Sequence, residues 1–244
     1  MSLLEKIERR VARYAPSRRM TLPKGRGAIS FCFDDFHVDA YEQGGRILEA
    51  ADMTGTFYLC AGLIDAELEG HSIASADTVK TAFDAGHEIG CHTFSHMDCQ
   101  ANSAAAVATD LEKNKVAITE LTGLAPYSFA YPFGKMSVAA KRLASDRFGS
   151  ARGVTGGINR GLADLGNLRA NQIYSNGFDL AALEGKIADV AANGGWLIFY
   201  THEVAEKPSP FGCRPDEFRA VVDAVAKSGV RCLPVKHALA SLVF

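Results

Sequence analysis

The sequence predicts an α/β fold, a single domain in which parallel strands curve into a (β/α) barrel of seven or eight units. From residue 25 to the C-terminus, apolar strand-like runs alternate with amphipathic helical segments, and no linker, repeat or low-complexity tract interrupts them. Polar candidates follow four widely separated strands: Asp34-Asp35, His92 with His96, Pro132-Phe133-Gly134, and Thr201-His202. A barrel is favoured because its strand ends converge at one mouth, whereas in an open sheet they would spread along an edge.

The composition sets limits on the class of protein. The chain has 244 residues, 48% of them hydrophobic, and a formal net charge of -2, which suits one globular domain with a substantial core. A near-neutral charge gives no electrostatic reason to expect nucleic acid as a partner. No apolar run approaches the roughly 20 residues that cross a bilayer, so we expect no membrane insertion.

The six cysteines form no C-x-x-C pair, and three of them sit in apolar strand-like runs. This usage is typical of buried, reduced thiols, and a cytoplasmic location is the simplest account.

Residues 1–24 are expected to be an N-terminal helix and a lead-in to the barrel, which occupies residues 25–244. Charges interrupt the first residues before any apolar core forms, so they do not look like a secretion signal. Apolar residues instead recur at helical spacing, which predicts a short amphipathic helix packed on the outside of the domain. These residues are Leu3, Leu4, Ile7, Val11 and Tyr14.

The remaining elements follow in order. Strands are expected at 28–33, 55–60, 88–91, 127–131, 148–154, 168–174, 196–200 and 230–235. Helices are expected at 41–50, 76–85, 103–121, 137–145, 179–192, 215–227 and 236–242. Helix 103–121 should direct Leu111, Val116, Ile118 and Leu121 to the core. The glycine-rich stretch 153–161 lacks the features of a phosphate loop or a dinucleotide fingerprint, so it is expected to be a flexible surface loop.

Two adjacent carboxylates, Asp34 and Asp35, end the apolar strand 28–33. One could cap the next helix while the other is solvated. Alternatively, a bend after the strand could aim one carboxylate at a metal and leave the other beside it as a base. His37 and Asp39 follow closely, and structural roles are favoured for both.

His92 and His96 follow the short apolar strand 88–91 and are four residues apart. On a helical turn, or on a tight loop leading into one, this spacing brings both imidazoles to one side, where they suit a borderline metal such as zinc. The pair alone is weak evidence, because two histidines can simply cap a helix.

Taken together, these motifs and two later ones resemble the pattern of a known family. F-D-D after a strand, H-T-x-x-H, Y-P-F-G, and an apolar strand ending in His resemble the polysaccharide deacetylases of carbohydrate esterase family four, the nodulation-deacetylase homology group. The resemblance covers about Gly25 to the C-terminus. It implies a distorted barrel with a metal site at the carboxyl ends of the strands, and hydrolysis of N-acetyl groups on an amino-sugar oligo- or polysaccharide.

The resemblance also implies residue roles. Asp35, His92 and His96 match the metal ligands, Asp34 the catalytic base and His202 the general acid, while Phe133 would offer its backbone N–H to the oxyanion. The implied cofactor is a divalent metal, with zinc first and Co, Ni, Mn or Mg as alternatives. The implied partner is an N-acetylated carbohydrate.

The sequence departs from the family pattern at Ala130, where many members carry an arginine that orients the catalytic Asp. The usual acidic and tryptophan partner motif is also not evident. We hypothesise that Arg169, on a neighbouring strand, supplies the missing guanidinium. This departure puts the substrate in doubt more than the metal.

Other functions are weighed against this one. The spacing after His87-Glu88 excludes an H-E-x-x-H protease, and no G-x-S-x-G elbow is present. A metal-dependent amidohydrolase acting on a small non-sugar amide remains open. A non-catalytic carbohydrate-binding barrel is less favoured, because Asp34, Asp35 and His202 are all present. Tyr131, Phe133, Trp196 and Tyr200 could stack on sugars, although most of them belong to apolar, core-like strands.

Overall fold

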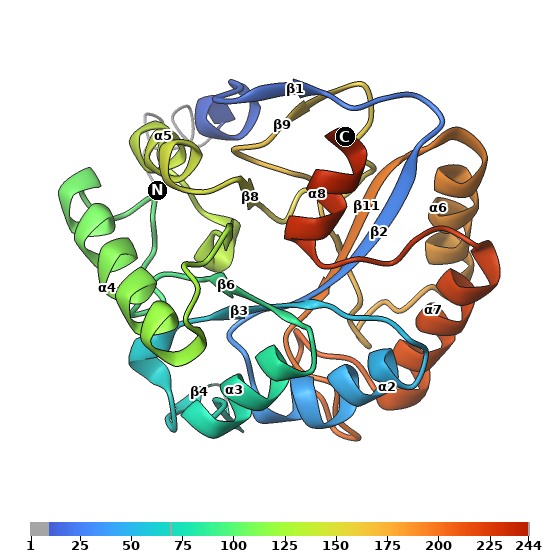
Figure 1. The fold of residues 1–244 in the computed structure, drawn as a ribbon, viewed down its shortest axis with the longest axis horizontal. Coiled ribbons are helices and arrows are strands. Elements are labelled where there is room, and N and C mark those ends of the chain that lie inside the picture. Colours follow the sequence, from blue (N-terminus) through green and yellow to red (C-terminus); the bar gives the residue numbers. More distant parts are fainter. Residues whose placement is uncertain (1–9, 69, 244) are drawn as a thin grey trace.

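A curled seven-stranded parallel sheet forms the centre of the protein, in a computed structural model that describes residues 10–68 and 70–243 (Figure 1). Its strand order is β10-β11-β2-β3-β6-β7-β8. In that order the strands are Asn171–Gln172, Gly195–Thr201, Gly27–Phe33, Thr56–Leu59, Glu88–Cys91, Ser128–Ala130 and Ser150–Arg152. Two short antiparallel pairs lie outside the sheet: β1 (Arg19–Thr21) with β9 (Leu162–Asp164), and β4 (Glu67–Leu68) with β5 (His71–Ser72).

Helices surround the sheet (Figure 1). They are α2 (Arg46–Glu49), α3 (Ala76–Asp84), α4 (Ala104–Thr122), α5 (Val138–Arg147), α6 (Leu180–Asn193), α7 (Pro215–Ser228) and α8 (Val235–Val243). A π-helical segment η1 (Ala40–Gly45) precedes α2, and the 3-10 turns η2 (Ala61–Leu63) and η3 (Pro132–Gly134) follow β3 and β7. Serine side chains cap the first turns of α3, α4 and α5, which satisfies backbone N–H groups there.

The alternation of side chains along the strands divides the core into two layers. In β2, Ile29, Phe31 and Phe33 belong to the apolar layer under the outer helices, whereas Ala28 and Cys32 belong to the inner layer. Successive strand residues point to opposite faces, so a strand buried on both faces reads as a continuous apolar run. This explains why the sequence pattern predicts the central strands well.

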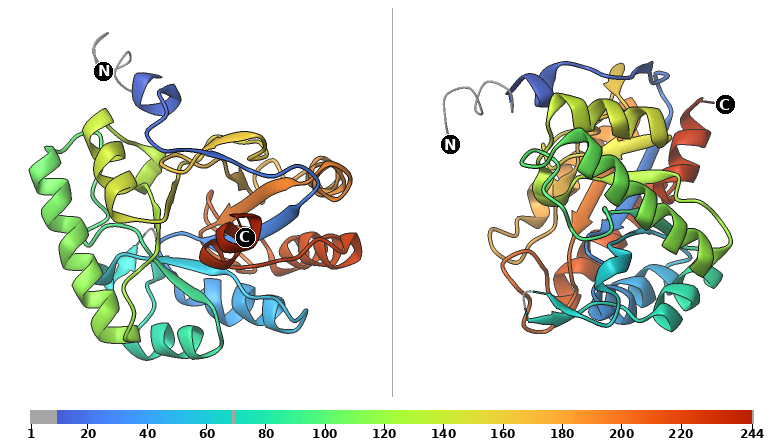
Figure 2. Two further views of the ribbon diagram at one scale, coloured as in Figure 1. Left: turned by 45° about the horizontal axis from the view of Figure 1, so that its top comes forward. Right: turned by 90° about the vertical axis from the view of Figure 1, so that its left-hand side faces the viewer.

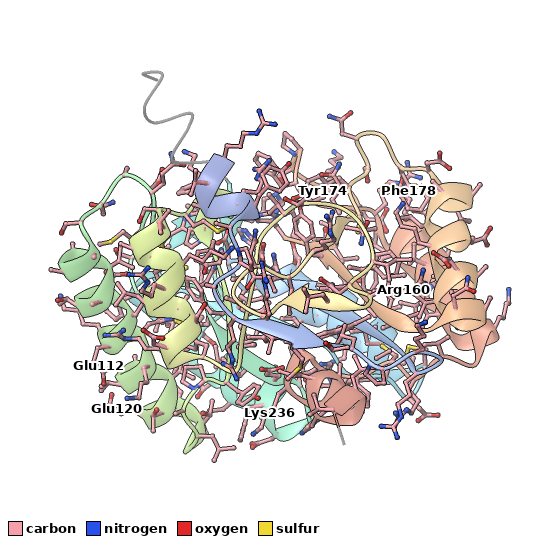
Figure 3. The ribbon with its side chains drawn as sticks, turned by 90° about the horizontal axis from the view of Figure 1, so that it is seen from above. Glu112, Glu120, Arg160, Tyr174, Phe178 and Lys236 are labelled. Carbon is pink, nitrogen blue, oxygen red and sulfur yellow. The ribbon has the colours of Figure 1, made fainter. Side chains whose placement is uncertain are left out.

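The two ends of the barrel differ. An isolated parallel bridge between Arg152 and Leu168 links β8 to the segment that leads into β10, so the sheet curls back on itself. Helix α8 covers the amino-terminal end, where the backbone N–H groups of Val235 and Lys236 donate to Thr56 and Glu88 at the starts of β3 and β6. Figure 3 shows Lys236 at one edge of the molecule and Tyr174 at the opposite edge. The predicted distorted barrel is confirmed.

Several predicted details differ. Residues 230–235 form only an isolated bridge between Cys232 and Ile29, because Pro234 has no N–H to extend the ladder and α8 begins at once. Val116 on α4 is 48% exposed rather than in the core. The loop 153–161 is fixed at Asn159, which is buried and exchanges two backbone hydrogen bonds with Trp196.

The N-terminal prediction falls partly outside the described residues, which begin at Arg10, so Leu3, Leu4 and Ile7 are not described. Residues 10–14 are helical, but Val11 and Tyr14 are 46% and 63% exposed, and Ala12 is the residue that packs inward. The expected apolar stripe therefore does not face the barrel over these residues. The chain then crosses the molecule through β1 to reach β2 (Figure 2). Within the described ranges, no helix combines the length and apolar character that spanning a membrane requires.

Candidate active site

The carboxylate pair sits where β2 ends. The backbone N–H of Asp34 donates to Thr201 of β11, which extends the strand pairing by one residue. Asp35 and Phe36 then adopt φ angles of 61° and 57°. Such left-handed conformations are uncommon for non-glycine residues and bend the chain sharply. Both carboxylates are buried. Asp34 faces Arg152, whereas Asp35 faces His92 and His96.

The two histidines lie on a loop after β6, not on a helix, because Thr93 and His96 both have positive φ angles. Asp110 of α4 fixes this loop by accepting hydrogen bonds from the backbone N–H groups of Phe94 and Ser95, at 2.7 and 3.1 Å, and from the Ser95 hydroxyl. Sequence reasoning missed Asp110. Its only local signal was a carboxylate on the inner face of an amphipathic helix.

Asp35, His92 and His96 converge as predicted for metal ligands. Asp35 Oδ1 lies 3.3 Å from His92 Nε2 and 3.2 Å from His96 Nε2, and one ligand atom from each residue lies within 4.8 Å of the others. His92 Nδ1 lies 2.8 Å from the Ala130 carbonyl, so it is the protonated nitrogen and leaves Nε2 as a lone-pair donor. Asp35 Oδ1 is buried and has no hydrogen-bond partner among the described residues, which fits an oxygen placed to bind a cation.

The protonation of these groups follows from burial and from their neighbours. Burial opposes ionisation of Asp35, but the nearby imidazoles of His92, His202 and His96 hold the pKa of its carboxyl well below the usual range. Burial lowers the pKa of His96 to about 4. His96 is therefore neutral at neutral pH, as a metal ligand must be.

Asp34 is held by an arginine that the sequence reasoning did not select. Arg152, the last residue of β8, donates to Asp34 Oδ1 and is 1% exposed. Its guanidinium carbon lies 4.7 Å from the ring centre of Tyr58 and 5.0 Å from that of Tyr200. The hypothesis that Arg169 plays this part is wrong: Arg169 is exposed, and its guanidinium donates to the Gly156 carbonyl. Arg152 points into the barrel, whereas Arg169 points out of it.

His202 follows β11 and faces the same site, with Nε2 3.8 Å from Asp35 Oδ2. Its Nδ1 lies 3.2 Å from the carbonyl oxygen of Phe211, so a backbone carbonyl, rather than a carboxylate, orients this imidazole. The segment between them is held by Glu203, a fully buried residue whose Oε1 accepts the N–H of Ser209 at 2.5 Å.

Phe133 lies on the opposite side of the site, in the turn η3. Its φ angle is 59°, the residue is 53% exposed, and its ring packs on His96 with 4.4 Å between ring centres. Phe133 therefore contributes its ring to the lining of the site.

These groups line one pocket of about 260 Å³. Its lining comprises Asp34, Asp35, His92, His96, Phe133, Gly134, Val154, Gln172, Tyr174, Tyr200, His202 and Phe211. Val154, Gln172, Tyr174 and Phe211 were not predicted, because they lie on loops and short strands without a motif. Of the four aromatics considered for sugar stacking, Phe133 and Tyr200 line the pocket. Tyr131 and Trp196 are core residues, bonded to the Gly166 carbonyl and the Ser30 hydroxyl.

His37 and Asp39 lie behind the site, outside its lining. His37 is buried, with Nε2 3.9 Å from Asp35 Oδ2, and burial lowers the pKa of its imidazole. Asp39 lies 3.8 Å from His71 on the β4–β5 hairpin. These positions agree with the supporting roles expected for both residues.

Comparisons with known proteins agree with this fold. The family model for polysaccharide deacetylase matches residues 21–147, just over half of the chain. A peptidoglycan deacetylase of Helicobacter pylori is 38% identical over 69 residues, a stretch that covers 28% of this chain and only 24% of that relative.

Solved structures show the same architecture over most of the chain. The chitin deacetylase of Colletotrichum lindemuthianum has a TM-score of 0.62 at 17% identity, over 90% of this chain and 89% of that one. A family 4 acetyl xylan esterase of Clostridium thermocellum, solved with a cobalt ion, has a TM-score of 0.61 at 15% identity, over 87% and 90%. The match to the family model, on a barrel of this kind, shows that the chain belongs to the polysaccharide deacetylase family.

Proposed function

We propose that this protein is a metal-dependent hydrolase that removes N-acetyl groups from an amino-sugar oligo- or polysaccharide resembling a chitooligosaccharide. The observation that carries the proposal is the meeting of four chemical groups in one pocket: the Asp35-His92-His96 cluster, the Asp34–Arg152 pair, His202 and Phe133.

The donor set fits a catalytic divalent metal. One carboxylate oxygen and two imidazole nitrogens make three protein ligands, and such sites leave coordination positions open for water and substrate. The buried, unpartnered Oδ1 of Asp35 supports the same assignment. A bound divalent metal would supply an activated water and polarise the acetyl carbonyl. Zinc suits this set best, with Co, Ni, Mn and Mg as alternatives.

The protein's own residues would perform the remaining steps. Asp34, held in place by Arg152, takes a proton from the attacking water. The backbone N–H of Phe133 donates to the oxyanion, an interaction worth about 3 kcal/mol in comparable sites. An amine is a poor leaving group and must be protonated as it departs. The Nε2 of His202 faces the site while Nδ1 is held by the Phe211 carbonyl, so this imidazole is placed to give that proton.

The rim of the pocket supports a carbohydrate substrate. Phe133 and Phe211 are 53% and 42% exposed, although both are large aromatic residues. Exposed aromatic rings beside a polar site can stack on the apolar faces of sugars. The relatives named as chitin deacetylase and peptidoglycan deacetylase support the same substrate class. The six free cysteines support a cytoplasmic location, and hence a soluble saccharide.

The test is acetate release from chitooligosaccharides by the metal-loaded protein, beside Asp34→Asn and a chelated sample. Loss of release in both controls is the expected result. If no acetate is released while one metal ion per chain remains bound, the chitooligosaccharide assignment is wrong. Small non-sugar amides are then the next substrates to assay, and turnover of those would favour the alternative amidohydrolase.

A further inference from the structure

The N-terminal segment differs in charge from the rest of the chain. Residues 10–26 contain six arginines and lysines and no aspartate or glutamate, whereas the whole chain has a net charge of -2. This segment runs through β1, which pairs with β9 on the flank of the barrel. Positive charge is thus concentrated where the N-terminal segment meets the chain that follows β8.

A second pocket, of about 310 Å³, lies on this flank and shares no lining residue with the active-site pocket. Four arginines line it: Arg13 and Arg19 from the N-terminal segment, and Arg160 and Arg169 from the chain between β8 and β10. Figure 3 shows Arg160 beside the end of α6, away from Tyr174 at the active-site edge. We call this hollow the arginine pocket.

Two charged residues of the arginine pocket, Arg160 and Asp164, already have hydrogen-bonded or ion-paired partners. Arg160 donates to Asp189 and to the Gly194 carbonyl at 3.0 and 2.8 Å. Asp164, the one carboxylate among the described lining residues, lies 2.6 Å from Lys141 and also accepts hydrogen bonds from the backbone N–H groups of Ser17 and Arg18. Asp164 therefore does not neutralise the remaining arginines.

Three guanidinium groups, those of Arg13, Arg19 and Arg169, have N–H donors without an acceptor among the described residues. Over residues 10–68 and 70–243, no carboxylate lies within 4.0 Å of the guanidinium groups of Arg13, Arg19 or Arg169. Within the same ranges the Arg169 guanidinium donates only to the Gly156 carbonyl, at 2.9 Å. Like charges around one hollow repel each other, and a bound anion removes that repulsion. Guanidinium forks pair bidentately with phosphate and carboxylate oxygens.

From these observations we infer that the arginine pocket binds a small ligand through a phosphate or diphosphate group. A monocarboxylate would balance only one of the three open guanidinium groups, whereas a diphosphate carries charge to match them all. Tyr14, Ile158 and Leu162 supply an apolar wall for the rest of the ligand. The pocket lies at the lower end of the size range of small-molecule sites. The phosphate could belong to a free metabolite or to a phospholipid headgroup.

Calorimetric titration of the 244-residue protein with inorganic pyrophosphate tests this inference. We expect saturable binding to one site that weakens as salt is raised. The double variant Arg19→Gln with Arg169→Gln should bind at least about tenfold more weakly, since it loses charge-assisted hydrogen bonds. The matched control Arg219→Gln, an exposed arginine on α7, should bind within about twofold of the unaltered protein. Thermal melts check that both variants fold.

The two sources of phosphate are separated by co-sedimentation with vesicles of phosphatidylcholine, with and without phosphatidylglycerol. Pyrophosphate binding without sedimentation indicates a free metabolite, and sedimentation that the double variant abolishes indicates a headgroup. No binding of either probe, or equal binding by the double variant, overturns the inference. Because neither assay requires turnover, the result is independent of the deacetylase proposal.

Discussion

Replacing Arg152 tests most directly whether this arginine balances the charge of Asp34 and holds it in position. Arg152 is an ionised side chain at 1% exposure, between the rings of Tyr58 and Tyr200, and Asp34 is its only carboxylate partner in the part of the chain that the structure describes. In Arg152→Met the volume is largely kept, but the Asp34 carboxylate remains buried without a cation. Removing one partner of such a pair costs about 3–5 kcal/mol. For a chain of this length, that is a fall in melting temperature of roughly 6–20 °C.

The measurement is urea unfolding of chelated protein, in a double-mutant cycle with Asp34→Asn. The loss of unfolding free energy in the double variant Arg152→Met/Asp34→Asn should be about 2 kcal/mol smaller than the sum of the losses in the two single variants, because the double variant buries no unpaired charge. Arg169→Met is the matched control and should change the free energy of unfolding by less than about 0.5 kcal/mol, since its side chain is exposed.

Catalysis gives a second readout of the same substitution. Metal-loaded Arg152→Met should release acetate about 100-fold more slowly, because Asp34 is no longer held in position. The reasoning is refuted if Arg152→Met unfolds within 1 kcal/mol of the unaltered protein, or if Arg169→Met is equally damaging.

Three other predictions concern the metal site, the acid and the pH dependence of stability. Zinc at about 100 times its dissociation constant should stabilise the protein by about 2.7 kcal/mol in thermal melts, and His92→Ala should abolish this gain; equal stabilisation of the variant would exclude His92 as a ligand. Glu203→Ala should free the segment that carries Phe211, and acetate release should slow because the Phe211 carbonyl no longer orients His202. The number of zinc ions bound per chain should stay the same, and a loss of zinc would show instead that Glu203 acts on the metal site. Burial lowers the pKa of the His87 imidazole below its ordinary value of 6.5. As the pH falls, the unfolded chain therefore binds a proton at this imidazole before the folded protein does. The stability that neutral His87 contributes is complete above pH 6.5 and is lost as the pH falls below it. Urea midpoints should therefore drop more on acidification to about pH 5 for the unaltered protein than for His87→Gln, and parallel curves would contradict this account.

The parts of the fold that could be predicted are those whose signal is local. The strands β2, β6 and β11 are buried on both faces, so their sequences are continuous apolar runs that end where polar residues begin. The short strand β9 lacks that signal, because three residues cannot establish a period, and of the strand expected at 168–174 only β10 forms. The β4–β5 hairpin was missed for the same reason.

The amino-acid sequence was enough to predict the barrel and the grouping of Asp35, His92 and His96 as candidate metal ligands. His92 comes directly after β6, Asp35 is the second residue after β2, and His96 lies four residues beyond His92. Parallel strands bring their carboxyl ends together whatever the details of packing. Only the tertiary structure identified Arg152 as the partner of Asp34, Asp110 as the anchor of the histidine loop and Phe211 as the support of His202. Arg152 is 118 residues from Asp34 in the chain, and which of two arginines meets it depends on the face of the curled sheet to which each points. That orientation is set by strand register and closure, which depend on contacts across the whole barrel and not on any local pattern.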